Sequence, residues 1–177
     1  GMGLTAYAEG EATPTAAEVL KPTVENNQVT EAKILEYAGK QWYVIASGGE
    51  GVQIANGAVA SQTGKTTLVL LAKENWGSNV YFVTNTNTSS AYGSSNLKTT
   101  IDSLVTSAGI RTYYENEDET WKNGLIATRT LAGGASLGDN YASVDNIYGS
   151  QLTGATLWPL SAKEVSQINN PSLARQV

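Results

Sequence analysis

Apolar residues in the first half of the chain occur in short bursts separated by glycine and polar residues. Two bursts, at 32–37 and 42–46, flank Ala38-Gly39-Lys40-Gln41, which is the pattern of a β-hairpin. The segment 66–72 is apolar almost throughout, and such a run is typical of a strand buried on both faces. A further strand is predicted at 79–83. These segments together predict a sheet of short strands.

Residues 84–93 are rich in Asn, Thr and Ser and predict a surface loop. Apolar residues with the spacing of a helix follow this loop. Ser94 or Ser95 is suited to cap this helix, and Gly109 to end it. Its apolar residues recur at the spacing of one helix face: Leu97, Ile101, Leu104 and Val105. We therefore expect a helix over 95–107 that buries Leu97, Ile101 and Leu104 against the sheet.

A weaker helical signal begins in the acidic run 117–119, since acidic side chains stabilise the N-terminal end of a helix dipole. This helix would bury Trp121, Leu125 and Ile126. The segment 133–154 is rich in glycine, Asn and Asp, and predicts a long loop with one short strand at its residues 146–148.

The C-terminal part changes from a strand pattern to a helix pattern around Pro159. Residues 157–160 are expected to form a strand, because proline favours extended geometry in the residue before it. Ser161 and Glu164 have the spacing of a capping box, which predicts a helix over 162–169. Asn169-Asn170-Pro171 should stop this helix and start a further turn.

The N-terminal residues 1–27 are expected to form a leader outside the fold. Ala6 and Ala8 form an Ala-x-Ala step like the end of a secretory signal peptide. The following residues are rich in Ala, Thr, Pro and Glu, which favours a flexible segment. Residues 28–177 are then a single α+β domain, with a mostly antiparallel sheet and two or three packed helices.

Composition excludes several classes of function. Charged residues make up 15% of the 177 residues, and the net charge is −5 with scattered basic residues, which argues against nucleic-acid binding. The absence of cysteine removes disulfides and thiolate metal sites, and the absence of histidine removes the commonest general base and metal ligand. We expect no cofactor, no bound metal and no membrane-spanning segment, and a secreted or cell-surface location.

The remaining chemistry-bearing residues are carboxylates, amides and tyrosines. Gly64-Lys65-Thr66 lacks the upstream glycine of a phosphate-binding loop and precedes a strand pattern, so we set nucleotide binding aside. Paired carboxylates could hydrolyse glycans, with these candidates: Glu36, Glu50, Asp102 and Glu164. The acidic loops leave calcium binding open. Residues that could contact a glycan or protein are Tyr92, Tyr113, Tyr114, Asp139, Asn140 and Asp145.

An ordered set of motifs carries a resemblance to a known family. The motifs are Trp42-Tyr43-Val44-Ile45, then 68–72, then Tyr92-x-x-Ser95-Asn96-Leu97-Lys98-x-x-Ile101, then Leu157-Trp158-Pro159-Leu160-Ser161-x-x-Glu164. The chain resembles an uncharacterised family of secreted domains from Gram-positive gut bacteria. That family looks distantly like C-type-lectin-like folds and the formylglycine-generating sulfatase-modifying enzymes. The resemblance covers about Lys40 to Ile168 and implies no established catalytic residues.

Members of that family usually continue into a closing strand that this sequence lacks after Val177. The resemblance thus implies an incomplete sheet, in which the hairpin at 32–46 lacks a partner, and a homodimer formed through the open edge. Taken together, we expect a non-enzymatic module that binds glycan or protein ligands. A glycan-acting hydrolase and a structural unit of a larger surface protein are the alternatives.

Overall fold

A computed structural model of the chain describes residues 16–53, 57–59, 66–75, 95–110, 113–115, 125–131, 156–160 and 162–174. The strands in these ranges are β1 Thr23–Glu25, β2 Gln28–Glu31, β3 Lys33–Tyr37, β4 Lys40–Ser47, β5 Glu50–Gly51, β6 Gly57–Val59, β7 Thr66–Ala72, β8 Tyr113–Glu115 and β9 Leu125–Leu131. The helices there are α1 Ala16–Val19, α2 Asn96–Ala108, α4 Ala162–Ser166 and α5 Pro171–Ala174.

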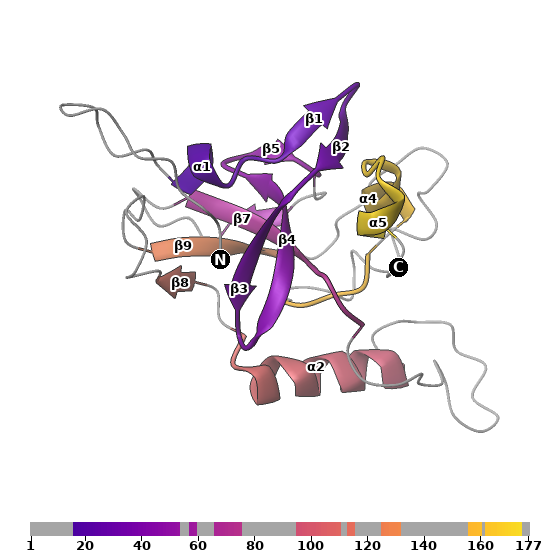
Figure 1. Ribbon diagram of the computed structural model, residues 1–177. Coiled ribbons are helices and arrows are strands. Elements are labelled where there is room, and N and C mark those ends of the chain that lie inside the picture. Colours follow the sequence, from indigo (N-terminus) through magenta and orange to yellow (C-terminus); the bar gives the residue numbers. More distant parts are fainter. Residues whose placement is uncertain are drawn as a thin grey trace.

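The main sheet of the described residues has the strand order β3-β4-β7-β9-β6, with β5 added on β4 and β8 added on β9 (Figure 1). Its neighbouring strands are antiparallel except for β7 and β9, which are parallel. The connection between these two parallel strands contains α2, as expected for a crossover. The prediction of an α+β fold with a mostly antiparallel sheet is confirmed.

Three hairpins in the first half close through two-residue turns with positive φ angles. The turn residues are Asn26-Asn27 (φ 51 and 62), Ala38-Gly39 (φ 52 and 71) and Gly48-Gly49 (φ 58 and 88). Turns with two left-handed residues match the twist of the strands that they join. The hairpin predicted at 32–46 is therefore confirmed as β3 and β4, with register Leu35↔Trp42 and Tyr37↔Lys40.

The centre of the sheet, formed by β4 and β7, is buried on both faces. Successive residues of a strand point to opposite faces. Accordingly Leu68 belongs to a smaller core cluster, whose buried members are Leu20, Leu35, Val44 and Leu68. Val69 belongs to a larger core cluster, whose buried members are Val29, Ile45, Ala46, Val52, Val69, Ile168 and Leu173. The predicted strand at 66–72 and its two-sided burial are both confirmed.

A β-bulge interrupts the pairing of β4 with β7. Val44 pairs with Leu70 and Ala46 with Val69, so Ile45 is the extra residue. The Ile45 carbonyl accepts a hydrogen bond from the Val52 N–H at 2.9 Å. The bulge thus connects the sheet centre to the segment after β5.

The larger core cluster includes Ile168, just after α4, and Leu173 of α5, and these two helices lie beside β2 in Figure 1. Ile168 forms a parallel bridge with Val29, in which the Val29 N–H donates to the Gln167 carbonyl and the Val29 carbonyl accepts the Asn169 N–H, both at 2.8 Å. Asn170 caps α5, since its side-chain oxygen accepts the Ser172 N–H at 3.0 Å. Pro171 occupies the first helical position, where proline is favoured. The turn predicted after Asn170 is confirmed.

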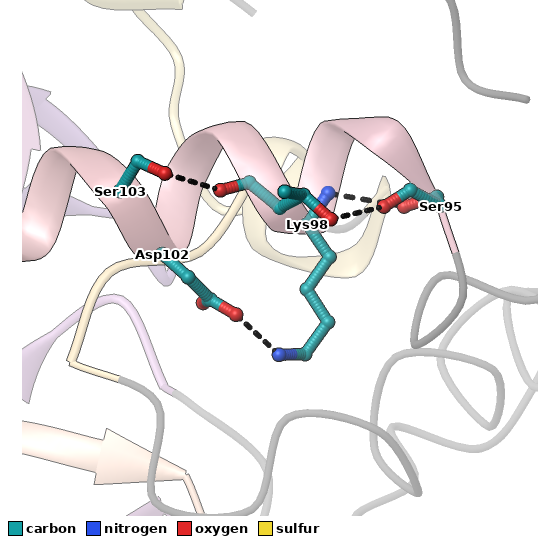
Figure 2. Close-up of polar contacts among 5 residues, drawn as sticks. Ser95, Lys98, Asp102 and Ser103 are labelled. Atoms are coloured by element: carbon teal, nitrogen blue, oxygen red, sulfur yellow. Dashed lines mark hydrogen bonds and ion pairs between the residues drawn. The ribbon is translucent and has the colours of Figure 1, made fainter.

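The helix predicted over 95–107 is confirmed as α2. Ser95 is its N-cap and accepts the Lys98 N–H at 3.0 Å (Figure 2). Gly109 ends the helix with φ 72. Leu97 and Ile101 pack against the larger core cluster. The expected burial is only partial, because every apolar residue of α2, Leu104 included, is half-buried.

The expectation that residues 1–27 form a leader outside the fold is wrong for 16–27. This segment contains α1 and β1, and β1 pairs with β2. Leu20 is 0% exposed in the smaller core cluster. Val19 and Leu20 form only a two-residue apolar step between Glu18 and Lys21, which gives no periodic signal, so only tertiary packing shows that Leu20 belongs to the core.

Two predicted elements near the end of the chain are also wrong. Leu125 and Ile126, expected in a helix, begin strand β9, which is rich in β-branched residues and pairs with β7, β6 and β8. Residues 157–160, expected as a strand, are irregular, and the following helix spans only 162–166. The strand at 79–83 and the loops at 84–93 and 133–154 lie outside the described residues.

Candidate functional site

The predicted ligand-binding residues fall mostly outside the described ranges. Tyr92, Asp139, Asn140 and Asp145 do so, whereas Tyr113 and Tyr114 are consecutive residues of β8. Their backbone pairs antiparallel with Ala127 and Ile126 of β9. Within the strand order, β8 is therefore on the far side of β7 from β3.

A second polar region, which we call the amide surface, consists of four side chains: Gln28, Gln53, Gln167 and Asn170. Gln53 and Gln167 form a reciprocal pair. The Gln53 backbone N–H donates to Gln167 Oε1 at 2.7 Å, and Gln167 Nε2 donates to the Gln53 carbonyl at 3.1 Å. This pair joins the segment after β5 to the end of α4.

The other two amides of this surface join β2 to α4 and α5. Gln28 Nε2 donates to the Ser166 carbonyl at 2.9 Å, and Asn170 Nδ2 donates to the Thr30 carbonyl at 2.8 Å. Gln53 Nε2 also donates to the carbonyls of Gly49 and Gly51. Gln53 is exposed, and the other three are half-buried. The amide surface is thus partly open to solvent and fixed by bonds to the backbone.

A buried carboxylate lies next to the amide surface along α4. Glu164 is 3% exposed, and its two carboxylate oxygens accept the Trp158 Nε1–H at 3.4 and 3.3 Å. Trp158 is half-buried and packs against the larger core cluster. A carboxylate is costly to bury without a donor. The indole N–H therefore supports Glu164 in this position.

The other carboxylates considered for hydrolysis lie on different elements. Glu50 of β5 forms an exposed ion pair with Lys21 at 2.7 Å. Asp102 of α2 pairs with Lys98 one helical turn away (Figure 2). Glu36 is exposed on β3. Among the described residues, no three acidic side chains gather into a group that could hold a metal ion.

No pattern in the sequence indicates the amide surface. Its members come from β2, the segment after β5, and the ends of α4 and α5, and none belongs to a motif. Glutamine and asparagine are ordinary surface residues. Only the folded chain brings them together.

No family model, curated protein or solved structure matches this chain. None of the helices in the described ranges is long and apolar enough to cross a membrane.

Proposed function

We propose that this chain is a non-enzymatic binding module of a secreted or cell-surface protein, which takes glycan or protein ligands. The amide surface is the observation that carries this proposal. It presents neutral donors and acceptors rather than an acid and a base. A lectin-like architecture, implied by the family resemblance, is part of the same proposal.

The amide surface suits a neutral polar ligand because its side chains are already oriented. The Gln53 backbone holds the Gln167 amide through two hydrogen bonds, and the carbonyls of Gly49 and Gly51 hold the Gln53 amide. Little side-chain entropy therefore remains to be lost on binding. Amides exchange hydrogen bonds equally well with sugar hydroxyls and with peptide groups.

The tyrosine residues are a second contact region in this proposal. Tyrosine combines a flat apolar ring with a polar hydroxyl, which suits both sugar rings and protein surfaces. Tyr113 and Tyr114 are on the short strand β8. Tyr92, Asp139, Asn140 and Asp145 remain predicted contacts from the sequence alone.

The engaged carboxylates favour binding over glycan hydrolysis. A hydrolase needs two carboxyl groups on either side of the scissile bond, about 5 to 9.5 Å apart. Glu164 is held by Trp158, Glu50 by Lys21 and Asp102 by Lys98. Each of these partners gives the carboxylate a structural role.

A glycan array combined with binding to immobilised bacterial surface proteins tests the proposal. Gln53→Glu replaces the exposed amide by a charged carboxylate and removes its bonds to the Gly49 and Gly51 carbonyls. In a chain whose circular dichroism is unchanged, it should weaken ligand binding about ten-fold or more. Gln41→Glu is the matched control, since Gln41 is also exposed but lies on β4 and accepts from Lys73. The control should bind like the parent chain.

Two results would contradict the proposal. One is the absence of binding to every glycan and protein presented, with the chain shown to be folded. The other is turnover of a polysaccharide that is lost in Glu164→Gln, which would establish the hydrolase instead. Loss of binding in the double variant Tyr113→Ala/Tyr114→Ala, with Gln53→Glu unaffected, would move the site to β8.

A further inference from the structure

Strand β3 is the terminal strand of the main sheet in the described residues, where it pairs with β4 alone. Tyr37 and Lys40 flank the two-residue turn between β3 and β4. The residues that flank such a turn form a hydrogen-bonded pair of the antiparallel ladder. Because such pairs alternate along an antiparallel ladder, Ile34 and Glu36 direct their N–H and C=O groups away from β4. Glu36 is exposed and Ile34 half-buried, so this edge is accessible.

We propose that the β3 edge binds the β3 edge of a second copy of this chain, antiparallel, with the two-fold axis at Leu35. In this register Ile34 of each copy faces Glu36 of the other. All four outward-facing residues of the two strands are then used, and each facing pair exchanges two backbone hydrogen bonds. This interface goes beyond the proposed ligand-binding function and uses a different part of the molecule.

The side chains of β3 favour this register over the two adjacent registers, in which the two-fold axis lies at Glu36 or Ile34. An axis at Glu36 would place two carboxylates directly opposite each other, and like charges in that position are destabilising. An axis at Ile34 would pair Glu36 with Ala32, which lies outside the strand. With the axis at Leu35, Lys33 faces Tyr37 of the other copy and no two like charges face each other. The second copy is therefore a self-complementary occupant of this edge.

The dimer should be weak. Five paired residues bury much less than the roughly 1,600 Å² of a standard interface. Lys33 and Glu36 are exposed, and charged side chains on an edge limit further association. We therefore expect a micromolar dimer and no larger assembly.

Sedimentation of the full chain across about a hundred-fold range of micromolar concentrations tests this interface. Glu36→Pro removes the outward N–H of β3 while leaving the bonds to β4 intact, since proline is tolerated on strand edges. It should weaken the dimer about thirty-fold, because two hydrogen bonds are lost per dimer. Glu36→Ala keeps the N–H and should dimerise like the parent chain.

Amide exchange of the parent chain provides a second measurement that does not depend on any variant. The N–H groups of Ile34 and Glu36 should become protected as the concentration rises, whereas protection of Leu35 should not change with concentration. A parent chain that stays monomeric over the whole range would overturn the proposal. So would a dimer in which Glu36→Pro associates as tightly as Glu36→Ala, or in which exchange at Ile34 and Glu36 is independent of concentration.

Discussion

Strand β7 and helix α2 carry the two clearest hydrophobic patterns in the sequence, but the fold buries them to different depths. Leu68 and Val69 of β7 are 0% and 4% exposed, on opposite faces of the sheet. No residue of α2 is fully buried. A strand between two others has neighbours on both edges and both faces, whereas a helix beside a sheet has them on one side. The pattern therefore predicts which face turns inward, and the position in the fold decides how deeply.

The largest effect should come from shortening a side chain at the centre of the sheet. Leu68→Ala is expected to lower the free energy of unfolding by about 4 kcal/mol, through lost burial and the cavity left behind. Leu70→Ala, on the same face of β7 but half-buried, should cost less. Urea unfolding with an unchanged m value measures both. Equal losses would show that depth within the sheet does not control stability here.

The next largest effect should come from the bulge beside this centre. A Cβ atom added to Gly51 would overlap the Ile45 carbonyl oxygen, and Gly51 also has φ 121. Gly51→Ala should therefore cost about 3 kcal/mol, from strain and backbone displacement. Gly49 has φ 88 and open space around its Cβ position, so Gly49→Ala should cost only about 1 kcal/mol. Equal melting temperatures of the two variants would show that a Cβ atom at position 51 does not clash with the Ile45 carbonyl oxygen.

The smallest effect should come from α2. Ile101 packs against the larger core cluster but remains half-buried, so Ile101→Ala should cost about 1.5 kcal/mol, less than the loss at a fully buried site. Thr106 is exposed on the same helix, and Thr106→Ala should change stability by less than about 0.5 kcal/mol. A loss at Ile101 as large as that at Leu68 would mean that α2 belongs to the core as fully as β7.

The elements that could be predicted are those specified by adjacent residues. The hairpin of β3 and β4 follows from two apolar bursts around Ala38-Gly39, and α2 from its serine cap, apolar face and Gly109. The start of α5 follows from Asn170-Pro171. In each case the signal lies within a few residues of the element that it specifies.

The elements that could not be predicted depend on distant contacts. Leu20 is buried by residues of β3, β4 and β7, and nothing around it in the sequence indicates this. Leu125 and Ile126 have an acidic segment before them that favours a helix, but pairing with β7 and β8 makes them a strand. Tertiary pairing outweighs helix propensity there, since propensities amount to less than about 1 kcal/mol per residue.

The candidate site was predictable only in part, for a similar reason. Tyr113 and Tyr114 of β8 can be selected from the sequence because a tyrosine ring and hydroxyl suit sugar or protein contacts, and their role as ligand contacts remains a prediction. The amide surface could not be selected, because its hydrogen bonds connect residues as far apart as Asn170 and Thr30. Common polar residues acquire a role only when the fold brings them together.

The short turns and the distant contacts of this fold should form at different stages of folding. Each of the three two-residue turns joins neighbouring strands, and hairpins of this kind form within about 1 to 10 μs. Gln28 and Ser166, in contrast, are 138 positions apart, and such long-range closure is slow. The attachment of α4 and α5 to β2 should therefore be completed late in folding. A ligand held at the amide surface would bridge these late-joining segments, and so would slow their separation and lengthen the lifetime of the folded state.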